Sequence, residues 1–370
     1  MSSIVILTRF DEEKHFGGDI VQSRAITKFL EQNGYKVRRI EIIDNTVTSL
    51  DLVIIFNLTR PLEAYLNAKE CIRKGIKYII FPVYWDLDSI KIPKTLNVKR
   101  RQYPLLIKDL YRALRNLSKT KYDKSKYIFD FTIYSSFKMC KFILNNAMLV
   151  CPNSNAELIH LIDKFKVNVI SKIIYNGIQT TIDKVNIPSS ILNVLPKDQF
   201  ILCMGAIGPR KNQLALVRAA NRTGINVVIM GGIAPNCESY ASLLMNEAKS
   251  NVIFLKSQPY SVAIKILEMS KGHIQPSFIE TPGLASLEAA SLGIPIVVSD
   301  VPPVKEYFSD FALYCNPFDV DSICSSLEKL ISLSYDDNMK LKADAKAYFT
   351  STYSWENALA PLLDLLEEFK

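Results

Sequence analysis

The sequence predicts an α/β protein made of two Rossmann-like domains, each built on a parallel sheet. The chain has 370 residues, which is longer than one ordinary hydrophobic core organises. Short apolar segments rich in β-branched residues alternate with helical segments, a pattern typical of parallel sheets covered on both faces. The alternation occurs twice, and the stretch 180–198 between the two series lacks helical periodicity and contains two prolines. We therefore expect two domains joined by a linker.

The first series extends from residue 1 to residue 180. The loop after its first strand ends in Gly17-Gly18, and a helix follows to about Asn33. The basic region 95–147 is expected to be helical, and the segment 169–177 closes the domain. Strands are expected at 3–9, 36–42, 51–57, 75–85 and 148–153, and further helices at 61–74 and 154–165.

The second series extends from residue 190 to residue 353. Its best-defined segment begins with a strand at 273–276 and continues through a loop into a nearly apolar helix at 282–292. Thr281 is the expected N-cap, with Pro282 at the first helical position. The other strands are expected at 200–208, 225–232, 251–257 and 294–299, and the other helices at 212–224, 239–250, 261–270, 321–333, 338–349 and 354–369.

Composition excludes several classes of protein. The seven cysteines are scattered and never form C-x-x-C, and the three histidines are far apart, so neither a disulfide framework nor a metal site is expected. The spacing Gly205-x-x-Gly208 does not match a dinucleotide fingerprint, which disfavours NAD. We expect no metal and no cofactor.

Positive charge is concentrated in the first domain. Residues 1–180 carry 29 basic and 17 acidic side chains, and 99–126 alone carries ten basic and two acidic ones. The piece 103–117 has an apolar face and a basic face, which suits docking on an anionic membrane. A helix packed on its own domain with a solvated basic face explains the pattern equally well. Nucleic acid is not expected, because no nucleic-acid-binding motif accompanies the basic residues.

Two glutamates mark the candidate functional segment. Glu288 lies between Leu284 and Leu292 on the helical wheel, inside the apolar stripe, where a carboxylate is costly unless it is paired. Glu280 lies eight residues earlier, about 12 Å away along a helix. That is about the span from ribose to sugar in an extended nucleotide-sugar, with the positive helix N-terminus near the diphosphate. The alternative is a surface carboxylate and a buried one paired within the core.

The basic pair Arg210-Lys211 forms the second candidate. It lies where a strand ends in Gly-x-x-Gly-Pro and turns into a helix at Asn212. Free backbone amides beside two cations suit a diphosphate. Two solvated loop cations are the alternative reading of the pair taken alone.

Several segments together resemble a known family. The stretch 271–307 looks like the E-x7-E signature of retaining glycosyltransferases of the GT-B fold, family 4 type. GAIGPRKN at 205–212, CPNSNAELI at 151–159, IIYNGI at 173–178 and SWENALAPLLDLLEE at the C-terminus resemble further segments of that family, in the same order. The resemblance implies the GT-B fold, with a cleft between the two domains. It also implies a last helix, 354–370, that packs back on the first domain.

The resemblance also implies roles for individual residues. Arg210 and Lys211 would neutralise the donor pyrophosphate, and Glu280 would hold hydroxyls of the transferred sugar. Glu288 would hold the ribose hydroxyls. The remaining donor-binding positions would be the backbone amides of Gly283 and Leu284 and the glycine pair Gly17-Gly18.

One departure from the family concerns the end of the strand at 75–85. Many relatives have a histidine there that faces the sugar, whereas this chain has FPVYWDLD at 81–88. Trp85 and Asp86 are our candidates for orienting the sugar or the acceptor, with Trp85 offering a face to a sugar ring. Core aromatics with a helix-capping Asp86 are the alternative.

The expected function is therefore metal-independent, retaining transfer of a hexose from a UDP- or GDP-sugar to a glycan hydroxyl. The acceptor would be lipid-linked, in lipopolysaccharide, O-antigen or another surface polysaccharide. A non-catalytic GT-B subunit that supports a partner glycosyltransferase at the membrane remains the alternative. We expect a cytoplasmic protein, and peripheral binding at the inner face of the plasma membrane stays open.

Overall fold

The computed structural model describes residues 3–10, 12, 17–86, 123, 130, 135–180, 185–333 and 335–368. These residues form two compact units. Unit 1 contains the described residues up to Trp85, those from 135 to Gly177, and the C-terminal helix from Trp355. Unit 2 contains Ile178–Ser354 together with Asp86. Each unit is built on a parallel sheet with helices, which confirms the predicted fold class.

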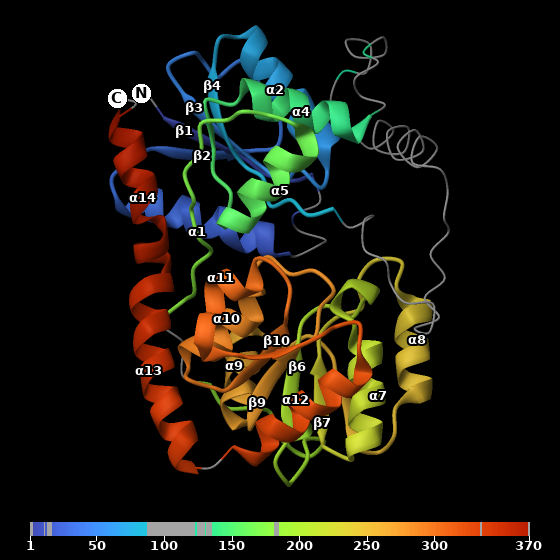
Figure 1. Cartoon of the computed structure of the whole chain (residues 1–370). Coiled ribbons are helices and arrows are strands. Elements are labelled where there is room, and N and C mark those ends of the chain that lie inside the picture. The colour runs from blue at the N-terminus through green and yellow to red at the C-terminus, as the bar shows by residue number, and fades with distance from the viewer. Residues whose placement is uncertain are drawn as a thin grey trace. The chain divides into compact units, whose positions relative to one another are not determined.

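Unit 1 has a parallel sheet with the strand order β2-β1-β3-β4-β5 (Figure 1). Its strands are β1 (Ile4–Leu7), β2 (Val37–Ile40), β3 (Leu52–Phe56), β4 (Lys77–Phe81) and β5 (Leu149–Val150). Its helices are α1 (Gly18–Gln32), α2 (Pro61–Arg73), α4 (Ser136–Asn146), α5 (Asn155–Phe165) and α14 (Trp355–Glu368).

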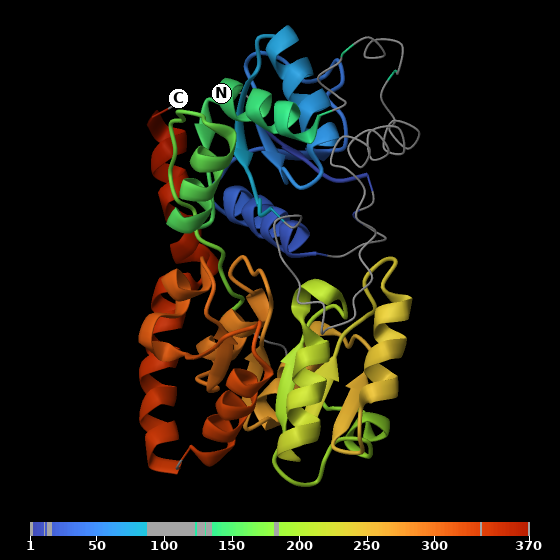
Figure 2. The same cartoon turned by 45° about the vertical axis from the view of Figure 1, so that its right-hand side comes forward.

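Alternation along the strands of unit 1 produces two hydrophobic layers. Successive side chains point to opposite faces of a sheet, so neighbouring residues of β3 enter different layers. Ile55 packs with α2, α4 and α5, and Ile54 packs with α1 and α14. The C-terminal helix α14 lies beside α1 in both views, although the two helices are at opposite ends of the sequence (Figure 2). The side chains of Leu359, Leu362 and Leu366 are almost fully buried there.

Unit 2 has a parallel sheet with the strand order β11-β10-β9-β6-β7-β8. Its strands are β6 (Ile201–Met204), β7 (Val227–Met230), β8 (Val252–Leu255), β9 (Gly272–Gln275), β10 (Ile296–Ser299) and β11 (Leu313–Cys315). Its helices are α6 (Ser189–Leu192), α7 (Gln213–Thr223), α8 (Glu238–Glu247), α9 (Tyr260–Met269), α10 (Leu284–Ser291), α11 (Val304–Phe308), α12 (Val320–Ser332) and α13 (Tyr335–Tyr353), with single 3-10 turns at η4 (Pro209–Lys211) and η5 (Ser309–Phe311).

The sheet of unit 2 is also covered on both faces. Helices α7, α8 and α12 pack on one face over Ile201, Val227 and Ile229. Helix α10 contacts β9 and β10 and also lies against α13. Strands β6, β7, β9 and β10 are buried along nearly their whole length, as expected for parallel strands with helices on both sides.

Three local differences from the sequence predictions are informative. The linker region contains the one-turn helix α6, which is too short to produce a detectable period. Strand β11 was not predicted, because it is short and lies at the sheet edge. Helix α10 begins at Leu284 with Gly283 as its N-cap, so the predicted Thr281 cap with Pro282 at the first helical position is wrong. Gly283 has φ +97°, a conformation that favours glycine over any side chain.

Candidate functional site

The predicted catalytic residues come together at the carboxyl edge of the unit 2 sheet. Arg210 and Lys211 lie in η4, which follows β6, and Glu280 lies in the loop after β9. Strands β6 and β9 are hydrogen-bonded neighbours, so the segments that follow them meet at the same edge. In open parallel sheets this edge is the usual place for a ligand.

Glu280 pairs with both cations. The Lys211 ammonium donates a short hydrogen bond to Oε2 of Glu280, and Nη1 of Arg210 lies 3.3 Å from Oε1. Arg210 also donates to the backbone oxygen of Ile279 at 3.0 Å. The Ser277 hydroxyl donates to Oε2 of Glu280 at 2.9 Å. Each carboxylate oxygen therefore has at least one donor that fixes its position.

The electrostatics of this cluster favour the charged forms of Glu280 and Lys211. Burial alone would raise the pKa of Glu280, but Lys211 and Arg210 lower that pKa to about 2. Burial lowers the pKa of Lys211, and Glu280 opposes that effect. The carboxylate therefore keeps a buried lysine protonated, and the lysine keeps a buried glutamate ionised.

Gly283 is the residue that lets Glu280 approach helix α10. A Cβ at position 283 would lie 2.8 Å from Cγ of Glu280, closer than real Cβ contacts, and the φ of +97° is itself unfavourable for a side chain. The amide of Leu284, the first residue of α10, has no carbonyl partner within the helix, whereas that of Ser286 donates to the Gly283 oxygen at 3.0 Å. The predicted residues Gly283 and Leu284 thus lie at the N-terminus of α10, beside Glu280.

Glu288 lies on the less buried side of α10. Leu284 and Glu288 share that side, as the helical wheel predicts, but the fully buried residues of the helix are Leu287, Ala289 and Ala290 with Ser286. Burial raises the pKa of Glu288 to about 7, and a hydrogen bond with the Tyr260 hydroxyl partly opposes this rise. Tyr260 begins α9, and its side chain is exposed.

Three polar residues near the cluster were not predicted. Ser277 is almost fully buried and orients Glu280. Asn212 is buried in a left-handed conformation and donates to the backbone oxygens of Pro276 and Pro317, which ties η4 to two other loops. His273 lies beneath α10 with Nε2 3.0 Å from the Ser286 hydroxyl, and burial lowers its pKa to about 3. Only the Ser-x-x-Glu spacing of Ser277 could have indicated such a role.

The predicted residues of the first domain lie at the carboxyl edge of the unit 1 sheet. Gly17 is the N-cap of α1 and Gly18 is its first residue, and the Arg9 guanidinium pairs with Asp19 at 2.9 Å beside them. Trp85 and Asp86 follow β4, and both are half-buried. The basic stretch 99–126, with the amphipathic piece 103–117, lies outside the described residues except for Asp123.

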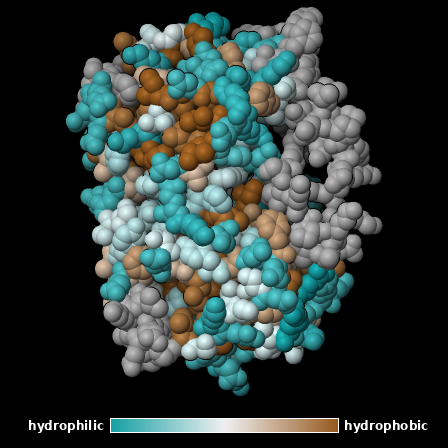
Figure 3. All heavy atoms as spheres, in the orientation of Figure 1, coloured by the Kyte–Doolittle hydropathy of each residue, from teal (hydrophilic) through white to brown (hydrophobic). Residues whose placement is uncertain are grey.

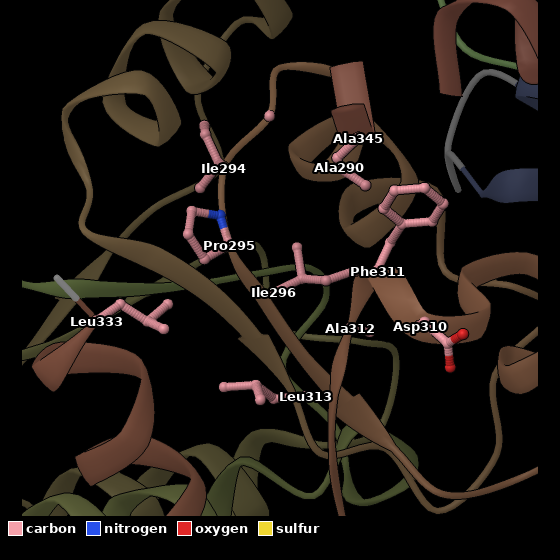
Figure 4. A pocket seen from close by; sticks show the side chains of 11 residues that line it. Ala290, Ile294, Pro295, Ile296, Asp310, Phe311, Ala312, Leu313, Leu333 and Ala345 are labelled. Atoms are coloured by element: carbon pink, nitrogen blue, oxygen red, sulfur yellow. The ribbon is translucent and has the colours of Figure 1, made fainter. Parts of the chain in front are cut away.

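A separate apolar pocket lies at the other edge of the unit 2 sheet (Figure 4). Ile296 and Leu313, the first residues of β10 and β11, line it together with Ala290 and Phe311. Asp310 is its one charged lining residue. This lining is unsuited to a diphosphate, and the pocket lies at the amino ends of strands whose carboxyl edge carries the ionic cluster.

Among the described residues, no group of three or more His, Cys, Asp or Glu side chains is arranged to hold a metal ion.

Comparisons with known proteins agree with this geometry. Residues 189–348 match the family model described as glycosyl transferases group 1. The chain is 27% identical over 213 residues to the O-antigen chain mannosyltransferase RfbU of Salmonella typhimurium, covering 56% of each protein. It is 30% identical over 183 residues to O-antigen chain mannosyltransferase B of Escherichia coli, covering 46% of this chain and 47% of that protein. The chain thus matches about half the length of these curated relatives.

Solved structures match along the whole chain. Sucrose-phosphate synthase of Thermosynechococcus elongatus has a TM-score of 0.74 at 14% identity, covering 100% of this chain and 99% of that one. HepE of Anabaena, in complex with UDP and glucose, has a TM-score of 0.67 at 15% identity, covering 100% of both chains. By its fold, the chain is therefore a GT-B protein. The match of residues 189–348 to the model of glycosyl transferases group 1 agrees with the resemblance seen in the sequence.

Proposed function

We propose that this protein is a retaining glycosyltransferase that moves a hexose from a UDP- or GDP-sugar to a hydroxyl of a growing surface polysaccharide. The cluster of Glu280, Arg210 and Lys211 at the carboxyl edge of the unit 2 sheet carries this proposal. The O-antigen chain mannosyltransferases among the relatives support a product of the lipopolysaccharide or O-antigen class. The UDP-bound structure with the same fold supports a nucleotide-sugar donor.

The two cations are suited to the departure of a nucleoside diphosphate. Breaking the bond between sugar and phosphate leaves negative charge on the departing phosphate oxygen. Donors fixed in advance near that oxygen stabilise the charge without having to reorganise during the reaction. Arg210 is half-exposed and Lys211 is mostly buried, so one is open to an arriving diphosphate and the other is held in place. With this charge supplied by side chains, the proposal needs no metal and no cofactor.

The two glutamates have different tasks in the proposal. Glu280 is ionised and accepts hydrogen bonds, which suits it to hold hydroxyls of the transferred sugar. Glu288 lies about one turn after Leu284, the first residue of α10, and is suited to hold the ribose hydroxyls. Neither is assigned as a nucleophile: the sugar departs and is attacked from the same face, without a covalent enzyme intermediate. The N-terminal amides of α10, at Gly283 and Leu284, would face phosphate or sugar.

In this proposal, unit 1 binds the acceptor. Gly17 and Gly18 open the first turn of α1 and leave room for a phosphate, and Trp85 with the adjacent Asp86 orients the sugar or the acceptor. A lipid-linked acceptor and peripheral binding at the cytoplasmic face of a membrane are further parts of the proposal. No helix among the described residues is both long and apolar enough to cross a bilayer.

Exposed hydrophobic side chains on unit 1 support a membrane-linked acceptor. Figure 3 shows a group of brown, hydrophobic residues on the displayed face of this unit. Ile159 and Ile162 of α5 are 60% and 38% exposed, and Ile170 is 75% exposed. Lys166 and Lys172 are exposed in the same segment. Apolar side chains flanked by lysines suit the interface of an anionic membrane.

A nucleotide-binding assay tests the proposal first. The purified protein is melted with a panel of UDP-, GDP- and ADP-sugars, and the correct donor raises the melting temperature because it binds only the folded state. That donor is then incubated with the protein, and free nucleoside diphosphate is measured with and without acceptor. Glu280→Gln and Lys211→Met should lower its release at least 100-fold.

The control is Lys265→Met, which removes an exposed lysine that pairs with Glu268 on α9. It should leave turnover unchanged. Full turnover by both Glu280→Gln and Lys211→Met would refute the site assignment. Donor binding without hydrolysis or transfer, with every acceptor preparation offered, would favour the non-catalytic subunit instead.

A further inference from the structure

The segment that follows β4 is held in a strained conformation. Val83 has φ +45°, which is rare for a β-branched residue. The backbone on either side is fixed. The amides of Asn57 and Leu58 donate to the oxygens of Phe81 and Pro82 at 2.9 and 2.7 Å. Such strain persists only where the surroundings impose it, and it is concentrated at functional sites.

A buried glutamate of α5 fixes the next residue. The Tyr84 amide donates to Oε1 of Glu157 at 2.6 Å, and the Asn153 amide donates to Oε2 at 2.7 Å. The Glu157 side chain is fully buried, and burial raises its pKa to about 7. Ser154 caps α5 by accepting from the Glu157 amide at 3.0 Å. A buried carboxylate thus ties the end of β4 to the start of α5.

The result of these constraints is an aromatic stack on α5. The rings of Trp85 and His160 are parallel within 15°, with centroids 4.9 Å apart. The Tyr84 ring lies over the same imidazole at 5.9 Å and 21°. Phe165, one turn further along α5, contacts the Tyr84 ring at 5.2 Å. Both aromatic residues that follow the strained Val83 therefore stack on the His160 ring.

The indole of Trp85 retains hydrogen-bonding capacity. Its Nε1 is buried and has no hydrogen-bond partner within the described part of the chain. Buried indole nitrogens normally have an acceptor. The ring also lies at the carboxyl edge of a parallel sheet, where ligands of such folds bind.

We propose that Trp85, stacked on His160, is a platform for a pyranose ring of the acceptor glycan, with Glu157 as the residue that positions it. The flat ring packs against the C–H face of the sugar, and the indole N–H donates to one of its hydroxyls. This inference rests on the proposed function, in which unit 2 holds the donor and unit 1 the acceptor. It adds His160 and Glu157 to the residues that the sequence indicates.

Tryptophan fluorescence tests the platform without requiring turnover. The chain has two tryptophans, so Trp355→Phe leaves Trp85 as the single tryptophan, and its emission is excited selectively at the red edge of the absorption band. This variant, saturated with UDP or GDP, is titrated with methyl α-D-mannopyranoside, methyl α-D-glucopyranoside and methyl α-D-galactopyranoside. At least one glycoside should change the emission saturably and protect Trp85 from acrylamide. Trp85→Phe, which keeps only Trp355, should show no change. An unresponsive Trp85, or equal responses from both tryptophans, would overturn the proposal.

Variants of the supporting residues separate a platform from a merely structural role. In the single-tryptophan protein, His160→Ala should weaken glycoside binding at least fivefold, and His160→Phe, which keeps a flat ring, should restore it. Glu157→Gln should increase acrylamide access to Trp85. Ile72→Ala, which removes an exposed apolar side chain of α2, is the control and should bind normally. Wild-type affinity in His160→Ala would contradict the stacking role.

Kinetics distinguish failure of the platform from failure of the proposed function. Trp85→Ala should raise the acceptor KM at least tenfold. An unchanged acceptor KM would refute the platform and leave the glycosyltransferase assignment intact. A wild-type protein with no donor binding and no hydrolysis would refute the assignment, and the glycoside titration would still decide whether Trp85 binds a sugar.

Discussion

Lys211 and Glu280 form an ion pair in which both side chains are largely removed from solvent, at 12% and 9% exposure. Glu288, eight residues after Glu280, has the Tyr260 hydroxyl as its partner rather than a cation. The two glutamates consequently differ in charge near neutral pH. The pKa of Glu280 is lowered to about 2, and that of Glu288 is raised to about 7. The surroundings of Glu280 keep it ionised, whereas the surroundings of Glu288 allow it to gain or lose a proton near neutral pH.

Removing the lysine of this pair should destabilise the protein. Lys211→Met leaves a buried carboxylate with Arg210 as its remaining cation, and breaking a buried pair in this way costs about 3–5 kcal/mol. Urea unfolding of the whole protein measures this loss in the free energy of unfolding. Lys265→Met, in an exposed pair on α9, should cost less than about 1 kcal/mol. In the double variant Lys211→Met/Glu280→Gln the loss should be smaller than the sum of the single losses, and strict additivity would contradict the coupling.

The same pair predicts the response to acid. A carboxylate whose pKa is lower in the folded state stabilises the protein above its unfolded pKa, near 4.5. That stabilisation is lost as the pH falls from about 4.5 towards about 2. Unfolding free energies measured across this window should fall less steeply for Glu280→Gln than for wild type. Parallel pH profiles would show that Glu280 is not held ionised by its partners.

Glu288 should have the opposite effect on how the free energy of unfolding depends on pH. Its folded pKa is raised, so its contribution to stability is greatest below pH 4.5 and declines as the pH rises through about 7. Glu288→Gln should therefore stabilise the protein at pH 8, by about 1–2 kcal/mol after allowance for partial exposure, and change little at pH 4. Donor affinity should fall in the same variant. Thermal melts at the two pH values, with and without donor, measure both effects.

The sequence was sufficient for the architecture and for the ionic cluster, for physical reasons. Buried parallel strands are near-continuous apolar runs, so β6, β7 and β9 were recognisable individually. Arg210 and Glu280 are far apart in the chain, but both follow strands of one parallel sheet, and such strands end at a common edge. The order of strands in the sheet therefore explains why these two side chains meet.

The sequence could not indicate side chains whose role depends on a contact with a distant loop. Asn212 joins two loops through single hydrogen bonds, and no local pattern precedes that arrangement. The same holds for His160 beneath Trp85, because the two residues come from segments 75 positions apart. The Thr281 cap failed for a different reason. The space beside Glu280 admits only glycine at position 283, and this tertiary constraint sets the start of α10.

Gly283→Ala tests that constraint directly. The new Cβ would meet Cγ of Glu280 at 2.8 Å, and the φ of +97° adds backbone strain. We expect a loss of more than about 2 kcal/mol and at least a tenfold fall in turnover, because Glu280 must move. Gly224→Ala is the matched control, since Gly224 has φ +71° and a Cβ added there would have no atom within 4 Å. It should lose only about 1 kcal/mol and keep full activity. Equal activity losses in the two variants would show that strain alone is responsible.

Val83→Asn should stabilise the protein. Val83 has φ +45°. Its neighbours are fixed by hydrogen bonds from the Asn57 and Leu58 amides and by the bond from the Tyr84 amide to the Glu157 carboxylate, so the strain stays in the folded state. Asparagine tolerates the left-handed region far better than a β-branched side chain, and the expected gain is about 1 kcal/mol. Lys166→Asn is the comparator, because Lys166 caps α5 at φ +50° but is not β-branched. Its gain should be smaller. Chemical denaturation measures both, and glycoside binding at Trp85 should be unchanged in Val83→Asn because the hydrogen bonds that place the tryptophan remain. Destabilisation by this substitution would mean that packing of the valine side chain outweighs the strain.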